Sequence, residues 1–245
     1  MSLNMHELLN ELQSPYRRID SLTRSRVRRI AQGKEFFSLP DDAKLFLHLI
    51  PCSEQPFVID KRDAAIRDLI RNLSLPFSEY LGYQRINVDG YFASDSRLDS
   101  TPISSYYQLY WNSGIEYGTL CPVNKRAIEK GEVRTIHAPE LEHHIVRTLQ
   151  SATRFLQQAQ APLPLRVSLS LVDAAGYQLT TQWYAFPEDH AIDRDELFFK
   201  PVMLENWDAD YGTVLRPVFD ALWNAGNYQF SGSYTESGEW KPRIQ

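Results

Sequence analysis

The sequence has few of the residues and runs that mark secreted or membrane proteins. Cys52 and Cys121 are the only cysteines among its 245 residues, too few for a disulfide scaffold, which favours reduced thiols in a cytoplasmic protein. No apolar run approaches the roughly 20 residues that cross a bilayer. The N-terminus also lacks a charged stretch followed by an apolar run and a small-residue cleavage site. We therefore expect a folded cytoplasmic protein that does not contact a membrane.

Glycine-rich loops are also absent. The 11 glycines are scattered singly, and neither a Gly-x-x-x-x-Gly-Lys-Ser/Thr loop nor a Gly-x-Gly-x-x-Gly loop occurs. No Gly-x-Ser-x-Gly turn singles out a serine nucleophile. Cys121 has no basic residue immediately before it that would stabilise a thiolate. The sequence by itself establishes no reaction, and we expect no cofactor.

The clearest pattern that is present lies between Tyr83 and Cys121. Tyr83–Phe92 predicts one strand, and Tyr106–Leu120 predicts two strands that reverse at Asn112-Ser113-Gly114, residues that tolerate positive φ. Alternation places Glu116 on the wetter face of this pair. The opposite, apolar face is expected to hold Tyr107, Leu109, Trp111, Ile115 and Tyr117. The segment predicts an antiparallel meander.

Periodicity predicts the remaining elements. Helices are expected over Ser14–Gly33, Asp60–Leu73, Pro139–Ala159 and Pro217–Gly226. Strands are expected at Lys44–Ile50, at Val167–Leu171 and within Ile192–Glu205, with a terminal hairpin at Tyr234–Trp240. Together these predict an α+β fold. Residues 35–245 form one domain with a mixed, mainly antiparallel sheet, whose central meander covers about 83–121, flanked by helices. Residues 1–34 form a helical, arginine-rich arm or linker.

The arm is strongly basic. Ser14–Lys34 holds seven basic residues and one acid, a net charge of +6, which leaves −11 for the rest of a chain whose total is −5. One side of the predicted helix carries Arg17, Arg24 and Arg28, which could contact a partner protein or nucleic acid, or simply face solvent. The other side, expected to pack on the domain, carries Ile19, Leu22, Val27 and Ile30.

One cluster has residue types that bind metals: His137, Glu140, Glu142, His143 and His144. Glu140 and His144 lie four residues apart on a predicted helix, so both could ligate a metal from one face. The recognised His-Glu-x-x-His spacing is absent. A polar helix start, with acids near its positive end, explains the cluster as well. We expect no metal here.

Other residues are candidates for catalysis or ligand binding. Asp89, Asp220 and Glu116 are carboxylates in apolar surroundings, where two could pair for acid–base chemistry or could simply accept hydrogen bonds. Tyr106, Gln108 and Tyr110 share one strand face, and Trp183 lies in an aromatic group with Tyr184 and Phe186. These side chains could line a ligand-binding cleft; packing in the core is the other interpretation.

Six segments occur in an order that resembles a known group of proteins. They are Arg26-Val-Arg-Arg-Ile30, Leu47-His-Leu-Ile-Pro51, Arg85-Ile-Asn-Val-Asp-Gly90, Tyr107-Gln-Leu-Tyr-Trp-Asn-Ser-Gly-Ile-Glu116, Ser168-Leu-Ser-Leu-Val172 and Pro217-Val-Phe-Asp-Ala-Leu-Trp-Asn-Ala225. From about Arg17 onward the chain resembles the C-terminal region of bacterial proteins with an AlbA-type, Schlafen-like domain at the N-terminus, described as DNA-binding or ATP-binding regulators. That domain itself is not in these 245 residues, so no ATP site is carried over.

The resemblance implies a non-enzymatic sensor or interaction domain of a bacterial regulator or defence-type protein. Its partner would be a Schlafen/AlbA-like module, in cis or in trans, or a second copy of the chain. One alternative is a hydrolase that uses the His137–His144 cluster and buried carboxylates. Another is a nucleic-acid-binding module that uses the arginine-rich helix. Because the rest of the chain is acidic, we do not expect this chain alone to bind nucleic acid.

Overall fold

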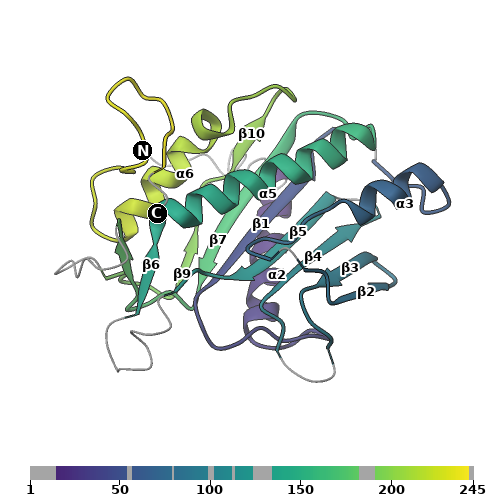
Figure 1. Cartoon of the computed structure of the whole chain (residues 1–245), viewed down its shortest axis with the longest axis horizontal. Coiled ribbons are helices and arrows are strands. Elements are labelled where there is room, and N and C mark those ends of the chain that lie inside the picture. Colours follow the sequence, from purple (N-terminus) through teal and green to yellow (C-terminus); the bar gives the residue numbers. More distant parts are fainter. Residues whose placement is uncertain are drawn as a thin grey trace, which may run out of the picture.

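The chain forms an α+β fold around one large sheet (Figure 1). The computed structural model describes residues 15–242, with gaps at 54–56, 79, 99–101, 112–113, 124–133 and 182–190. Within these residues, eight strands form a sheet in the order β10-β7-β1-β5-β4-β3-β2, and β9 also pairs with β7. Neighbouring strands of this sheet run antiparallel, whereas the small separate sheet of β6 and β8 is parallel. The predicted fold class is confirmed.

The elements have the following bounds. The strands of the large sheet are β1 (Lys44–Pro51), β2 (Tyr83–Ile86), β3 (Gly90–Ser94), β4 (Ser105–Tyr110), β5 (Gly114–Leu120), β7 (Leu165–Val172), β9 (Glu196–Phe198) and β10 (Val202–Leu204). The small sheet consists of β6 (Thr135–His137) and β8 (Gln178–Thr180). The helices are α2 (Pro15–Ala31), α3 (Ala64–Arg71), α5 (Ala138–Gln158) and α6 (Tyr211–Ala225).

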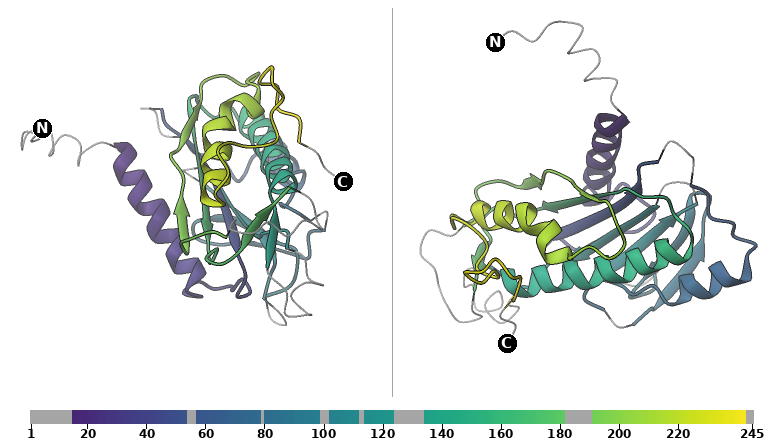
Figure 2. Two further views of the ribbon diagram at one scale, coloured as in Figure 1. Left: turned by 90° about the vertical axis from the view of Figure 1, so that its left-hand side faces the viewer. Right: turned by 90° about the horizontal axis from the view of Figure 1, so that it is seen from above.

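Helices lie on both faces of the large sheet (Figure 2). The long helix α5 and helix α6 cover one face, whereas α2 lies against the other face with its N-terminal end pointing away from the body. No helix in the described ranges is both long enough and apolar enough to span a bilayer.

The two faces of the sheet differ in composition. Side chains alternate between the faces along each strand, so residues of one parity meet α5 and those of the other meet α2. The α5 face is aliphatic and aromatic, with Leu45, Leu47, Leu49, Tyr107, Leu109, Ile115, Tyr117, Val167, Leu169 and Leu171 in the main core. The α2 face is largely polar although it is also buried, with Lys44, His48, Gln108, Glu116, Arg166, Ser168 and Ser170.

The expected single strand over Tyr83–Phe92 is wrong. The chain reverses within this segment, and β2 pairs with β3 in the register Ile86↔Tyr91. The Asn87 side chain accepts hydrogen bonds from the backbone N–H groups of Asp89 and Gly90, which closes the turn. An Asn-x-Asp-Gly turn inside an alternating run thus divides one expected strand into two.

The hairpin expected around Gly114 is confirmed. Strands β4 and β5 pair antiparallel, with Tyr110 opposite Gly114. Gly114 has φ of +111°, and a Cβ there would lie 2.0 Å from the carbonyl oxygen of Leu49. Only glycine fits this position, because the backbone of β1 passes so close to it.

Two helices begin at other residues than expected. Helix α6 starts at Tyr211, six residues before Pro217, because the Asp210 side chain caps it by accepting from the N–H of Gly212. Pro217 lies inside the helix. Helix α3 is shorter than Asp60–Leu73, because Asp63 caps its first turn.

Candidate functional site

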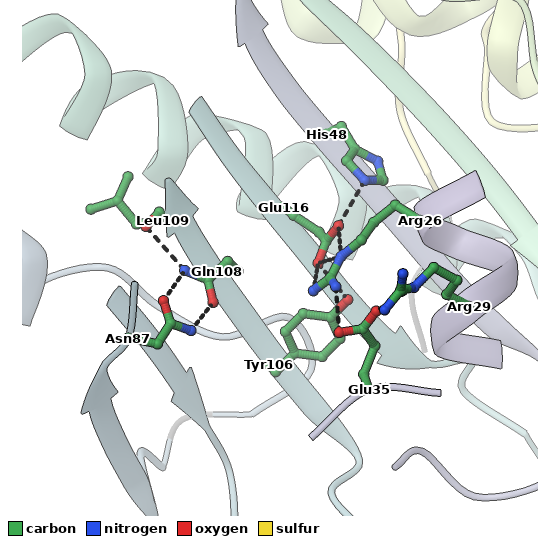
Figure 3. A network of polar contacts seen from close by, with 9 residues as sticks. All are labelled: Arg26, Arg29, Glu35, His48, Asn87, Tyr106, Gln108, Leu109 and Glu116. Carbon is green, nitrogen blue, oxygen red and sulfur yellow. Dashed lines mark hydrogen bonds and ion pairs between the residues drawn. The ribbon is translucent and has the colours of Figure 1, made fainter. Parts of the chain in front are cut away.

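The largest group of interacting charges lies between α2 and the sheet, around Glu116 of β5 (Figure 3). The Glu116 side chain is fully buried. Its carboxylate accepts hydrogen bonds from Arg26 Nε at 3.2 Å, from His48 Nε2 at 3.1 Å and from the Tyr106 hydroxyl at 3.0 Å. Helix α2 and three neighbouring strands therefore meet at one carboxylate.

The sheet register and the docking of α2 bring these groups together. His48 on β1 lies directly opposite Glu116, so the two side chains share the α2 face. Val27 and Ile30 of α2 are buried in a small apolar cluster with Phe37, Phe46, Phe92 and Tyr106, among others. This packing sets the rotation of the helix, and Arg26, next to Val27, consequently points at the sheet.

The network keeps Glu116 ionised. Burial alone would raise the pKa of its carboxyl, but the hydrogen bond from His48 and the charge of Arg26 outweigh burial and lower the pKa to about 2. Burial, together with the nearby Glu116 charge, raises the pKa of Tyr106 and of Tyr110. Glu116 thus serves as a permanent anion at neutral pH, unlike the carboxyl with a raised pKa that acid–base chemistry needs.

Further ion pairs hold α2 in place. Arg26 also pairs with Glu35 at 2.6 Å, and Arg29 pairs with the same carboxylate at 3.0 Å. Nearer the start of the helix, Asp20 accepts from Arg166 NH2 of β7 at 2.5 Å. Charged contacts accompany the few apolar ones that fasten α2 to the body.

The expected contact residues Arg17, Arg24 and Arg28 do not form one outward stripe. Arg28 pairs with Glu196 of β9 at 2.6 Å, and the Arg24 guanidinium lies 4.8 Å from the centroid of the Phe198 ring. Arg17 lies on an exposed part of the helix. The expected docking of Leu22 on the body is wrong, because 62% of its side chain is exposed. The ion pairs of α2 thus act together with the packing of Val27 and Ile30, and Leu22 lies outside this contact.

The expected ligand residues on β4 share one face, as predicted, but that face is covered. Tyr106 and Gln108 are buried, and Tyr110 is half-buried. The Gln108 side-chain oxygen accepts from Asn87 Nδ2 at 2.9 Å, and its nitrogen donates to the Leu109 carbonyl at 3.3 Å. Tyr106 and Gln108 therefore form polar contacts inside the fold. Trp183, with Tyr184 and Phe186, lies outside the described residues.

Within the His137–His144 cluster, Glu140 lies near two histidines, and one of its oxygens is 3.7 Å from His137 Nδ1. His137 is buried and its Nε2 lies 3.2 Å from the Thr181 carbonyl oxygen. His144 stacks on the Phe77 ring at 4.0 Å, and burial, with the charges of His143 and Arg147, lowers its pKa to about 4. The nearest Glu140 oxygen lies 3.8 Å from His144 Nε2. No three His, Cys, Asp or Glu side chains form a metal-binding group within the described ranges.

Glu142, from the same cluster, belongs instead to the core beside α5 and α6. Its Oε1 accepts from Trp223 Nε1 at 2.6 Å and from the Ser231 hydroxyl at 2.7 Å, and its Oε2 accepts from Trp240 Nε1 at 3.1 Å. Burial raises the pKa of this carboxyl, although the hydrogen bonds act in the opposite direction. Glu142 fastens the C-terminal segment onto the two helices.

The other candidate residues stay apart. Asp89 is exposed in the turn between β2 and β3, whereas Asp220 accepts from the backbone N–H of Ser231 at 2.9 Å. Neither carboxylate belongs to the network around Glu116 that Figure 3 shows. Cys121 is buried, and burial raises the pKa of its thiol. The fold therefore does not support acid–base catalysis by these carboxylates or a reactive thiolate at Cys121.

Sequence reasoning overlooked His48 and Ser168. His48 Nδ1 and Ser168 Oγ are buried without a hydrogen-bond partner among the described residues, and the two residues lie directly opposite each other on β1 and β7. A signal was present, because Arg166, Ser168 and Ser170 recur at every second position of an otherwise apolar run, and Lys44 and His48 interrupt another.

Comparison of the chain with protein-family models, with curated proteins and with solved structures finds no match. The functional argument therefore rests on the site itself. Its ionised pairs provide rigid attachment of a helix to a sheet.

Proposed function

We propose that this chain is a non-enzymatic sensor or interaction domain of a bacterial regulator or defence-type protein. It works in the cytoplasm with a Schlafen/AlbA-like module, supplied in cis or in trans, and α2 is its docking arm. The observation that carries the proposal is the attachment of α2. Ion pairs hold the helix against the sheet while Leu22 on its outer side stays 62% exposed.

An attachment of this kind suits a docking arm. Contacts between domains are more polar than the cores of domains, and paired charges specify one orientation of the helix. Leu22 and Arg18 lie four residues apart on the exposed side, so they form one patch on the helix surface. A leucine flanked by an arginine is a suitable contact for a partner with an apolar, acidic surface.

The test is binding of the purified chain to a purified Schlafen/AlbA-like module, measured by calorimetry. Leu22→Asp should weaken binding at least about tenfold, because a charge would be buried in the contact. Val88→Asp is the matched control, since Val88 is 92% exposed and lies in the β2–β3 turn far from α2 in the sequence. The denaturation midpoint of each variant should match that of the unaltered chain.

Absence of binding by the unaltered chain, or equal weakening by both substitutions, would contradict the proposal. Sedimentation of the chain alone tests the remaining partner, a second copy, because the same substitution should then shift a dimer towards monomer.

No specific observation favours either of the two alternative functions. The histidine cluster forms no metal-binding group in the described part of the chain. Arg24 and Arg28 already contact Phe198 and Glu196. We propose neither a hydrolase nor a nucleic-acid-binding module.

A further inference from the structure

A groove of about 310 Å³ lies between α2 and the β7–β9 edge of the sheet. Arg24 of α2, together with Phe198 and Lys200 after β9, forms its rim, and Ser168 and Ser170 of β7 lie at its base. A larger hollow of about 830 Å³ adjoins it and shares Arg24, Phe198 and Lys200. Both volumes are in the range of small-molecule sites.

The rim has unbalanced positive charge. Asp20 in the groove is paired with Arg166, and Glu196 beside it is paired with Arg28. Lys200 makes no ion pair with any described residue, whereas Arg24 lies over the face of Phe198 and near enough to Glu196, the partner of Arg28, for its charge to help lower the pKa of that carboxyl. Two exposed cations from separate elements therefore face one opening, an arrangement that favours a doubly charged phosphate.

The base of the groove has an incomplete chain of hydrogen bonds. Glu116 accepts from His48 Nε2, and the other ring nitrogen, Nδ1, is buried without a hydrogen-bond partner among the described residues. Ser168, directly opposite His48 on β7, is buried, and its hydroxyl also makes no hydrogen bond to a described residue. Because Ser168 lies at the base of the groove, this hydroxyl can form a hydrogen bond with a molecule bound there.

We propose that this groove binds a small phosphorylated sugar or polyol. The phosphate lies between Arg24 and Lys200, and a hydroxyl of the ligand donates to Ser168 Oγ. The ligand hydroxyl thus gives a partner to the buried Ser168 Oγ, which has none among the described residues. This site goes beyond docking by α2 and does not depend on it.

The experiment is a titration of the isotope-labelled full chain, followed by NMR at constant ionic strength set with chloride. Ribose 5-phosphate is the main probe, and inorganic phosphate and ribose test its two halves. Ribose 5-phosphate should give saturable shifts at backbone amides 168–170 and 198–200. Inorganic phosphate should bind more weakly, and ribose should not bind. Absence of saturable shifts with ribose 5-phosphate would overturn the proposal.

Substitutions test which residues bind the phosphate half of the ligand. Lys200→Ala and Arg24→Ala should each weaken binding of ribose 5-phosphate about tenfold, the loss expected for one charge-assisted hydrogen bond. Lys61→Ala and Arg18→Ala are matched controls, because both residues are exposed and neither lines the groove. Equal weakening by a control and its partner variant would overturn the proposal.

Ser168→Ala separates ligand recognition from a structural role. It should weaken ribose 5-phosphate about tenfold and leave the weaker binding of inorganic phosphate unchanged. Equal loss with both probes would overturn the assignment of the hydroxyl. AMP distinguishes the two sources of a ribose phosphate. Tighter binding of AMP than of ribose 5-phosphate assigns the adjoining hollow to a base and favours a nucleotide, and the reverse order favours a free sugar phosphate.

Discussion

Two buried glutamates, one on each side of the sheet, are stabilised in different ways. Glu116, under α2, accepts from Arg26, His48 and a tyrosine hydroxyl, and the first two lower its pKa to about 2 despite burial. Glu142, on α5, accepts only from neutral groups, two indole N–H groups and a serine hydroxyl, and burial raises its pKa. One carboxyl is stabilised as an anion, whereas the other is satisfied by hydrogen bonds alone.

The difference reflects what each carboxyl attaches. Helix α2 buries few apolar side chains, so its position depends on charges that also sit in the sheet. The segment around Trp240 is attached to a face that is already apolar, where aromatic rings provide the contact area and Glu142 accepts their N–H groups. A charged attachment specifies orientation, and an apolar one with neutral donors mainly adds stability.

The largest expected effect comes from neutralising the charged site. Glu116→Gln removes the fully buried charge that pairs with Arg26, so we expect the free energy of unfolding to fall by about 3 kcal/mol, at the low end for a broken buried pair because the Arg26 side chain is 25% exposed and keeps its pair with Glu35. Glu142→Gln is the matched control. It keeps Oε1 and loses the bond from Trp240, so we expect a loss of about 1 kcal/mol. Urea denaturation at neutral pH measures both changes in the free energy of unfolding. Equal losses would show that the two carboxyls contribute equally to stability.

The pH dependence of the same two variants sharpens the comparison. The folded pKa of Glu116 lies below its ordinary 4.5, so its contribution is complete above pH 4.5 and is lost as the pH falls towards 2. The folded pKa of Glu142 lies above 4.5, so the stability that its protonated form contributes is complete below 4.5 and is lost as the pH rises above it.

Urea denaturation of the unaltered chain and each variant across this range gives the difference in unfolding free energy. That difference should shrink on acidification for Glu116→Gln and shrink on raising the pH for Glu142→Gln. Slopes of the same sign would show that the two carboxyls ionise alike.

The smallest effect is expected at the rim of the α2 contact. Arg28 and Glu196 form a close pair, but their side chains are 50% and 37% exposed. Water and salt screen such a pair, so Arg28→Ala should not change the denaturation midpoint measurably. A midpoint change as large as that of Glu116→Gln would show that exposed ion pairs, rather than the buried network, hold α2 on the sheet.

Much of the secondary structure could be predicted from local pattern. The β4–β5 hairpin, strand β1, strand β7 and helix α5 are confirmed, because side-chain periodicity and turn residues act over a few positions. The prediction of a single strand over Tyr83–Phe92 was wrong for a local reason, because the Asn87 side chain closes a turn inside an alternating run. The prediction that Leu22 packs on the body was wrong for a distant reason, because contacts such as the pairing of Asp20 with Arg166 orient the helix.

The sequence by itself determined which residues alternate, where the chain can turn and that the first helix is basic, because these depend on neighbours along the chain. Only the tertiary structure decided that the polar face of the sheet is buried. Glu116, expected on the wetter face, lies there with His48 and Ser168 because β1 enters the sheet between β5 and β7. Strand order and the rotation of α2 bring together polar side chains from residues 26, 48, 116 and 168, and that proximity is not encoded in any local pattern.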